Sequence, residues 1–197
     1  MQAYDKHQKL LRYKKKLESL ARISKKDFDQ LCSIMHERDL KKGEVILKEG
    51  QICKCYYYIN NGSIRGFEIH EGKEININFY FEEDLACNFR SFIRQSPSSL
   101  NLVAAENCKV FYVSRSDAIE LFLNNNSLHF LLFRFFEELY LKEEEHSSMF
   151  KLMSPAQRYK HTLDNHPNYF QQVPLTHLAS YLGMSRETLN RIRKNFQ

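Results

Sequence analysis

The sequence predicts a mixed α+β protein in which a roll of short β-strands lies between helical segments. Residues 43–112 hold short β-branched and aromatic runs separated by turn signals such as Asn60-Asn61-Gly62, a texture typical of an all-β sandwich or barrel. Residues 5–37 and 115–153 instead place apolar residues at helical spacing. After Pro155 three shorter helices are expected, so the chain combines one β domain with helices on both sides.

The β region contains six expected strands. In residues 75–79 apolar and polar side chains alternate strictly, which predicts one buried apolar face and one polar face. Before the strands, Ser24 followed by Asp27 marks the start of a helix. The expected strands cover residues 45–47, 56–59, 64–69, 75–81, 102–105 and 110–113.

The second helical segment has a heptad pattern, because its apolar residues recur at alternating steps of four and three. A long helix with such a seam needs a partner, and a symmetric dimer is the simplest solution. The alternative is a helix buried on its own β domain. The predicted dimer seam consists of Leu128, Leu132, Phe135, Leu139, His146 and Met149, with Lys142 and Met153 in the same register.

The composition indicates a folded intracellular protein. Hydrophobic residues make up 43% of the 197 residues, which supports real cores. No apolar run approaches the roughly 18 residues that span a bilayer, and residues 1–7 lack the apolar segment of a signal peptide. The odd, scattered set of cysteines argues against a secreted disulfide framework. We therefore expect a cytoplasmic protein without a membrane partner. The cysteines are Cys32, Cys53, Cys55, Cys87 and Cys108.

Charge is distributed unevenly along the chain. Residues 43–150 hold 10 Lys/Arg against 16 Asp/Glu, whereas residues 151–197 hold 7 against 2. A basic C-terminal segment behind an acidic middle suggests a nucleic-acid-binding end on a non-binding body, although a solvated basic face has the same charge.

Residues 175–195 have the pattern of a helix-turn-helix. Ala179 provides a small side chain where two helices cross closely, and Gly183 stands in the tight turn, where the backbone needs a positive φ. Ser185 is a good N-cap for the second helix. The residues expected to face the domain core are Leu178, Leu182, Met184, Leu189 and Ile192.

The side chains left exposed on the second helix suit a DNA major groove. Arg can pair with guanine, Glu can accept from cytosine and Asn can pair with adenine, each good pair giving about 1–3 kcal/mol of discrimination. Arg193 and Lys194 are better placed for phosphates, which position rather than specify. The alternative is a helical hairpin that contacts protein. The predicted DNA-binding residues are Thr176, His177, Ser185, Arg186, Glu187, Thr188, Asn190, Arg191, Arg193 and Lys194.

Residues 178–192 resemble the helix-turn-helix of Crp/Fnr regulators, and residues 42–65, with Lys42-Gly43-Glu44 and Asn60-Asn61-Gly62, resemble their cyclic-nucleotide-binding-type β-roll. The resemblance covers nearly the whole chain. It implies a double-stranded β-helix, or jelly-roll, sensor domain, a long dimerisation helix and a DNA-binding domain. In the catabolite-activator branch an Arg-Glu pair and a later Arg read the operator. Arg186, Glu187 and Arg191 match those positions.

Two departures from the family pattern concern the effector and the end of the chain. Cyclic-AMP-binding members carry a Glu and an Arg in their phosphate cassette, where this chain has Asn88 and Ser98. Without that Arg a buried cyclic phosphate loses its charge-assisted partner, so we expect a different effector or none. Only Phe196 and Gln197 follow the recognition helix, so a full β-hairpin wing is expected to be lacking. The residues expected to line the effector pocket are Cys87, Asn88, Phe89, Ser98 and Ser99.

Other chemistry finds less support. An Fnr-like iron–sulfur cluster needs several N-terminal cysteines, and only Cys32 precedes the β-roll. Cys53 and Cys55 would face one side of a strand, which suits a metal or redox switch, or they are simply packed cysteines. A jelly-roll metalloenzyme needs clustered histidines and carboxylates, and His70 stands alone near a turn. We expect no catalytic residues, no metal and no certain cofactor.

The sequence thus predicts three domains and a regulatory function. Residues 1–122 form the sensor domain with its N-terminal helices, residues 123–153 the dimerisation helix and residues 154–197 the DNA-binding domain. A homodimer would bind a pseudo-palindromic site in double-stranded DNA, and an effector signal would move a hinge near residues 153–155. RNA polymerase is implied as a partner by the resemblance. The alternative function is a ligand-binding sensor module whose C-terminal helices contact protein.

Overall fold

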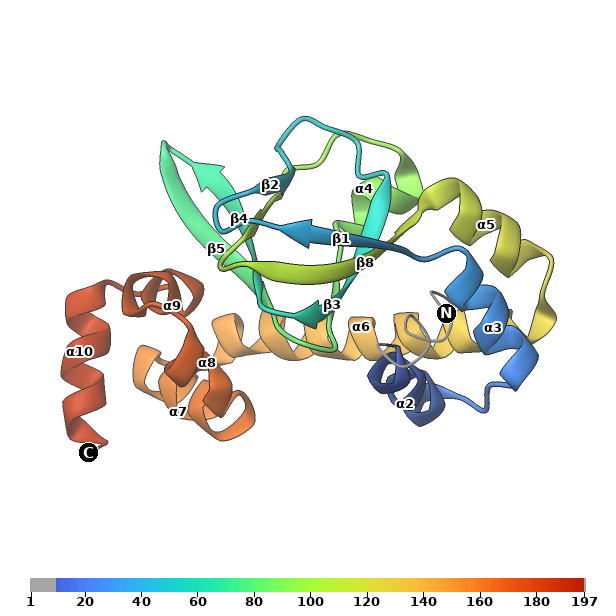
Figure 1. The fold of residues 1–197 in the computed structure, drawn as a ribbon. Helices are drawn as coiled ribbons and strands as arrows, with labels where there is room; N and C mark the ends of the chain where they lie inside the picture. Colours follow the sequence, from blue (N-terminus) through green and yellow to red (C-terminus); the bar gives the residue numbers. More distant parts are fainter. Residues whose placement is uncertain (1–9, 197) are drawn as a thin grey trace. The chain divides into compact units, whose positions relative to one another are not determined.

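The computed structural model describes residues 10–196 (Figure 1). The chain forms two compact units: Met1–Gly66 with Tyr80–Glu138, and Phe67–Phe79 with Leu139–Gln197. Residues 5–9 of the predicted N-terminal helix lie outside the described residues. In residues 10–196 no helix is both long and apolar enough to cross a bilayer.

The helices occupy both ends of the chain, with one short helix inside the β region. They are α2 (Leu11–Leu20), α3 (Lys25–Ser33), α4 (Phe89–Arg94), α5 (Arg115–Leu123), α6 (Asn126–Leu152), α7 (Pro155–Asn165), α8 (Pro167–Gln172), α9 (Leu175–Tyr181) and α10 (Arg186–Asn195). The strands are β1 (His36–Leu40), β2 (Val45–Leu47), β3 (Cys55–Asn61), β4 (Ile64–His70), β5 (Lys73–Tyr80), β6 (Leu85–Ala86), β7 (Asn101–Ala104) and β8 (Cys108–Ser114).

The strands form two four-stranded sheets, in the orders β1-β8-β3-β6 and β2-β7-β4-β5. This arrangement confirms the predicted β-roll and all six predicted strands. The largest fully buried side chains of the first unit include Tyr58 and Phe111, which face each other across the β3–β8 pair, together with Phe28 of α3. The turn after β3 contains Gly62 at φ +92°, where an added Cβ would lie 2.7 Å from the carbonyl oxygen of Asn107.

The first two residues of strand β1, His36 and Glu37, were expected to end a helical segment. Its five residues are mostly exposed, and only Leu40 is buried, so its side chains show no strand pattern. The segment is a strand because its backbone pairs with β8, from His36 opposite Tyr112 to Leu40 opposite Cys108. The preceding helix was read correctly, because the Asp27 N–H donates to the Ser24 Oγ at 3.1 Å and so caps α3.

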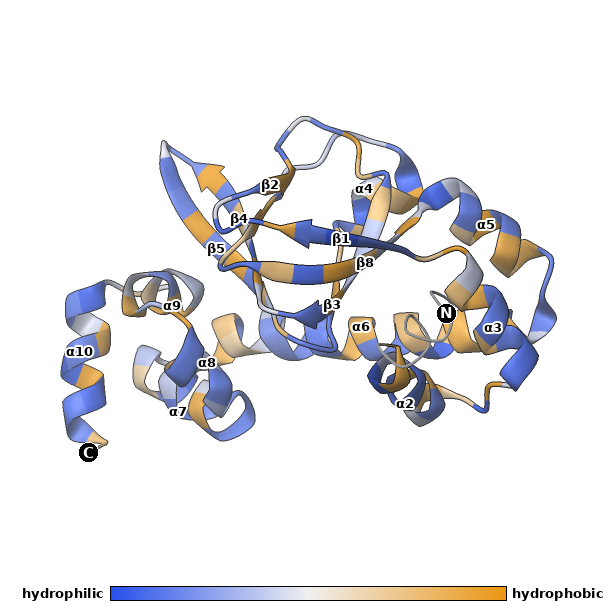
Figure 2. Ribbon diagram, viewed as in Figure 1, coloured by the Kyte–Doolittle hydropathy of each residue, from blue (hydrophilic) through white to orange (hydrophobic). Residues whose placement is uncertain are grey.

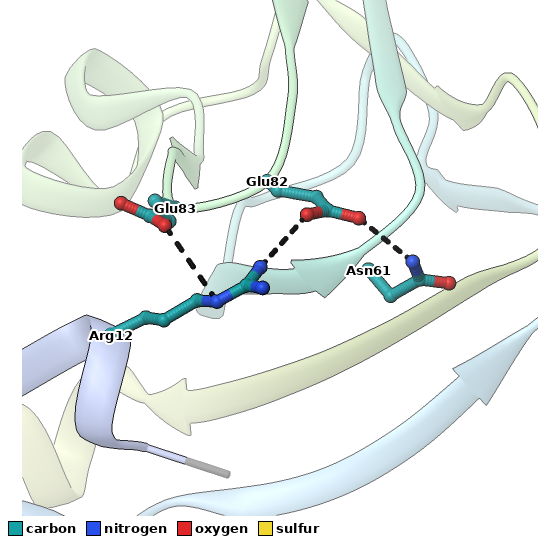
Figure 3. A network of polar contacts seen from close by, with 4 residues as sticks. All are labelled: Arg12, Asn61, Glu82 and Glu83. Carbon is teal, nitrogen blue, oxygen red and sulfur yellow. Dashed lines mark hydrogen bonds and ion pairs between the residues drawn. The ribbon is translucent and has the colours of Figure 1, made fainter.

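Helix α2 is tied to the roll by a polar network (Figure 3). The guanidinium of Arg12 lies 3.0 Å from Glu82 and 4.0 Å from Glu83, which stand between β5 and β6. Asn61 at the end of β3 donates to the other oxygen of Glu82 at 2.7 Å. Because these groups are largely exposed, the network orients α2 while adding only about 0–1 kcal/mol per pair.

The structure shows how far each residue of the predicted dimer seam on α6 is covered within one chain. Leu128 and Met149 are only 1% and 2% exposed, so the chain itself covers them. Leu132, Phe135, Leu139 and His146 are half-buried. At about 100° per residue these positions share one face, and the predicted dimer seam stays a prediction.

Three exposed aromatic side chains of α6 lie on the opposite face. Phe130, Phe133 and Tyr140 are 59%, 63% and 67% exposed. We call these three residues the outer stripe. Figure 2 shows hydrophobic and hydrophilic segments alternating along α6, as expected for a helix with apolar residues on more than one face.

Candidate nucleic-acid interface and sensor cassette

The second unit contains the predicted helix-turn-helix. Helices α9 and α10 meet at Gly183, whose φ is +64°, and the Met184 N–H donates to the Ala179 carbonyl at 3.0 Å. Ser185 caps α10 by accepting the Thr188 N–H at 3.1 Å. The predicted core residues Leu178, Leu182, Leu189 and Ile192 are buried with Ala179, and Met184 is half-buried. The local geometry therefore follows the sequence pattern closely.

Helix α10 leaves its polar face free in this unit. Its charge is mainly positive, and Figure 2 shows that most of the helix is hydrophilic. The Glu187 pKa is lowered by hydrogen bonds from its own backbone N–H and from Ser185, so the carboxylate stays charged as an acceptor. Thr176 at the start of α9 is exposed as well, whereas His177 and Thr188 are half-buried. The exposed residues are Ser185, Arg186, Glu187, Asn190, Arg191, Arg193 and Lys194.

Arg158 of α7, which the sequence analysis did not single out, holds the turn in place. Its Nε donates to the Leu182 carbonyl at 2.9 Å and its Nη2 to the Gly183 carbonyl at 3.3 Å. Its Nη1 donates to the Met153 carbonyl at 2.9 Å, next to the predicted hinge. Ser154 then starts α7 with a capping box formed with Gln157. One side chain thus joins the predicted hinge to the turn before α10, a role that needs the planar fork of arginine.

The hairpin segment Phe67–Phe79 belongs to the same unit and contacts α9. The Ser180 hydroxyl accepts the Asn76 N–H at 3.0 Å and donates to the Glu74 carbonyl at 3.2 Å. Phe79 packs on Tyr169 and Tyr181, each at 5.5 Å between ring centroids. These contacts correct the expected apolar face of β5 at its start. Asn76 is buried beside α9, whereas Ile75 is 39% exposed.

His146 lies in an aromatic group next to the helix-turn-helix. Its ring is 5.1 Å from Phe150 and 5.2 Å from Tyr181. Its Nε2 is buried, and no described residue offers it a hydrogen-bond partner. Burial lowers the pKa of His146 below its usual range, with Glu143 acting in the opposite direction and His166 in the same direction. The neutral imidazole is therefore the form that suits the folded chain.

Acidification is expected to destabilise the second unit through His146. Because its folded pKa lies below the unfolded value of about 6.5, the unfolded chain takes up the proton first. Stability is then complete above that value and decreases as the pH falls through the folded pKa. Hydrogen exchange in α9 and α10 from about pH 8 to about pH 5 measures this loss. H146L should flatten the dependence, and H129L in the first unit is the control. An unchanged profile in H146L would show that another group is responsible.

In the first unit, the predicted effector residues lie in one segment, residues 87–100, which we call the cassette. The Asn88 side chain caps α4 by accepting the Ser91 N–H at 3.1 Å and donates to the Ser98 Oγ at 2.8 Å. The Ser98 hydroxyl in turn donates to the Leu100 carbonyl at 2.8 Å. The two positions that depart from the family pattern thus bond to each other, with Cys87 and Ser98 buried and Ser99 exposed.

Phe89 connects the cassette to α6. Its ring lies 5.4 Å from Phe135 and 5.9 Å from Phe136, both within the first unit. Phe135, predicted as part of the dimer seam, thus also takes part in the packing of the first unit. A shift of α4 would be felt directly at α6, because close-packed aromatic rings transmit displacement rather than absorb it.

The structure pairs Cys53 with Cys87 rather than with Cys55. The Sγ atoms of Cys53 and Cys87 are 3.7 Å apart, and both residues are buried. Cys53 Sγ also lies 3.2 Å from the Cys55 carbonyl oxygen. In residues 10–196 no group of three or more His, Cys, Asp and Glu side chains is arranged to hold a metal ion.

Comparisons with known proteins agree with this arrangement. Residues 37–125 match the cyclic nucleotide-binding domain family. Catabolite activator protein from Thermus thermophilus superposes with a TM-score of 0.58 at 20% identity, over 88% of this chain and 83% of that one. The chain has the Crp/Fnr fold. FixK2 from Bradyrhizobium japonicum shares the Crp/Fnr fold, with a TM-score of 0.69 at 17% identity over 82% of this chain and 84% of that one.

The c-di-GMP responsive global regulator CLP from Xanthomonas campestris is a further similar structure. It superposes with a TM-score of 0.66 at 18% identity, over 88% of this chain and 92% of that one. A sequence search among curated proteins found no match. These likenesses show that the chain has the Crp/Fnr fold, and CLP is a global regulator that links cell-cell signalling to virulence gene expression.

Proposed function

We propose that this protein is a DNA-binding transcription regulator of the Crp/Fnr type that acts as a homodimer on a pseudo-palindromic site. The observation that carries the proposal is the α10 face, where Arg186, Arg191, Arg193 and Lys194 are exposed while Leu189 and Ile192 fill the core behind them. A capped helix with that distribution can enter a major groove without loss of its own packing. Arg186, Glu187 and Arg191 are the proposed base readers, and Arg193 and Lys194 the proposed phosphate contacts.

Selection of binding sites from a random duplex library by the full chain tests the proposal. We expect enrichment of two related half-sites about one helical turn apart. Affinity for the selected site should fall steeply with salt and exceed affinity for random DNA by about 10³-fold or more. Absence of any enriched sequence, with binding equal to that of random DNA, would defeat the function. Retained binding to a protein partner alone would favour the sensor-module alternative.

The outer stripe of α6 is the proposed dimer contact. Phe130, Phe133 and Tyr140 leave large apolar surfaces in water on one face of a 27-residue helix. A second copy of the same helix offers a matching surface, as a twofold axis requires. Such a twofold also places two recognition helices for one pseudo-palindromic site.

The dimer prediction is tested with F130S/F133S. Light scattering should give the monomer mass of 23.5 kDa instead of twice that value, because each exposed Phe contributes about 1.5–3 kcal/mol when buried. I93S removes an equally apolar side chain that is 50% exposed on α4 and should leave the dimer intact. If F130S/F133S stays dimeric while F135S becomes monomeric, the contact is the half-buried face and not the outer stripe.

The proposed effector is not cyclic AMP. A cyclic phosphate needs a cation in the cassette, and here the equivalent positions are Asn88 and the buried Ser98, already bonded to each other at 2.8 Å. A cyclic phosphate would break the hydrogen bond between Asn88 and Ser98 and find no cation there, so these polar groups would lose a partner without gaining a charged one. Cyclic AMP should therefore cause no shift of the thermal midpoint of the full chain, and a concentration-dependent increase would overturn this part of the proposal.

A further inference from the structure

Two buried thiols of the first unit lie in contact with each other. The Sγ atoms of Cys53 and Cys87 are 3.7 Å apart, and the residues are 2% and 3% exposed. They are 34 positions apart in the chain. Pairing of β3 with β6, with Tyr57 opposite Ala86, brings the segments before and after these strands together. The contact follows from the sheet and is therefore present in every folded copy of this unit.

The surroundings make the two sulfurs chemically different. Cys53 accepts hydrogen bonds from the Cys87 thiol and from the Asn88 N–H, which lower its pKa to about 7, although burial acts in the opposite direction. Burial and the contact with Cys53 raise the pKa of Cys87 well above its usual value. Cys53 is thus the more easily ionised sulfur, and Cys87 keeps its proton. A nucleophilic thiolate beside a protonated thiol is the arrangement that a two-step disulfide requires.

We propose that Cys53 and Cys87 form a reversible disulfide in response to hydrogen peroxide. The Cys53 thiolate attacks one peroxide oxygen, the O–O bond breaks, and the departing hydroxide takes up a proton to give water and a Cys53 sulfenic acid. The Cys87 sulfur then attacks the Cys53 sulfur, the S–O bond breaks, and hydroxide leaves with the Cys87 proton as a second water. Two thiols and one peroxide thus give a disulfide and two waters, and a dithiol reductant reverses the reaction.

Burial selects the oxidant. Because both thiols are almost fully covered, an oxidised tripeptide or a larger disulfide cannot reach either sulfur, whereas hydrogen peroxide is close to water in size. Bond formation requires the sulfurs to approach from contact distance to about 2.05 Å. The short segment between Cys87 and α4 must follow this movement.

The position of Cys87 makes the bond a structural signal. Cys87 precedes Asn88, the N-cap of α4, and Phe89, which packs on Phe135 and Phe136 of α6. The Cys53 N–H also donates to the Ser91 Oγ inside α4 at 2.9 Å. Oxidation therefore acts on α4 at two points, Cys87 and Ser91, on either side of the Phe89 ring that contacts α6. The disulfide itself is independent of the proposed function, and only its use as a regulatory input depends on DNA binding.

The test uses the reduced full chain exposed to increasing hydrogen peroxide. We expect the five thiols to fall to three, and peptide mass spectrometry without reductant should recover the segments of Cys53 and Cys87 joined. C87S should instead accumulate a sulfenic acid on Cys53 that a dimedone probe captures. C55S is the matched control and should still form the bond. Oxidised glutathione should leave all five thiols free.

Hydrogen exchange on the same samples tests the coupling. Oxidation should change exchange in α4 and in the part of α6 from Asn126 to Glu138, and the change should vanish in C87S. Five free thiols after peroxide treatment, or preferential oxidation of Cys55 or Cys32, would overturn the proposal. A disulfide without any change in α4 or α6 would overturn the coupling. Loss of DNA binding in every state would count against the proposed function alone, because the disulfide is read by mass.

Discussion

Replacing Arg186 and Arg191 with alanine should lower the affinity for the selected DNA site by about 10²-fold or more, since each base-reading arginine contributes about 1–3 kcal/mol. Both side chains are exposed and point away from the core of the unit, so the variant should fold normally. Thermal unfolding and circular dichroism check folding, and fluorescence anisotropy with the selected and a scrambled duplex measures binding. The loss should be much larger for the selected duplex than for the scrambled one.

Two single variants sharpen the interpretation. R193A should weaken binding to both duplexes to a similar extent and reduce the salt slope by about one, as expected for a phosphate contact. R90A removes an exposed arginine of α4 and should change neither value. If the double variant binds DNA as tightly as the parent but loses a protein partner, α10 is a protein-binding helix and the regulator proposal is wrong.

Replacing Gly183 with alanine should destabilise the helix-turn-helix by about 1–3 kcal/mol, the usual cost of holding a non-glycine residue in such a conformation. Gly183 has φ +64°, and an added Cβ would lie 2.7 Å from Cε1 of Phe150. Hydrogen exchange in α9 and α10, together with denaturant unfolding, measures the loss. DNA binding should decline in parallel, because the turn sets the direction of α10.

Two comparisons separate the causes. Gly72 has φ +75° with no atom within 4 Å of an added Cβ. G72A is therefore expected to lose only the stability that comes from holding alanine at a positive φ. G183A/F150L should recover only the stability that G183A loses through the steric contact with Phe150. A G183A variant with unchanged exchange would mean that the turn tolerates a side chain and that glycine is not required there.

The local features of this protein were readable from the chain alone. The helix-turn-helix depends on residues close in sequence: Ala179 at the crossing, Gly183 in the turn and Ser185 at the cap, and each takes the predicted place. The strands with β-branched and aromatic runs were equally clear, because their side chains fill a core. Such signals can be read from a sequence because the local backbone conformation restricts which residue types fit at each position.

Features that depend on distant partners were missed or misread. His36–Leu40 is a strand because β8 pairs with its backbone, which leaves almost no mark on its side chains. Arg158 acts on carbonyl groups 24 and 25 positions away, and any residue has a carbonyl. Asn76 is buried because Ser180 of α9 lies against it, although the alternation of β5 assigned burial to the isoleucines.

The heptad of α6 and the cysteines show most clearly that local patterns can be read from the sequence whereas contacts with distant residues cannot. Spacing correctly placed Leu128 and Met149 on one apolar face, but spacing carries no information on whether that face meets a second copy or the chain itself. The Cys53-Lys54-Cys55 pattern drew attention to neighbours in sequence, while the reactive contact joins Cys53 to Cys87. Periodicity and turn chemistry act over a few residues. Sheet register and helix packing bring together residues from anywhere in the chain, so they alone determine which groups meet.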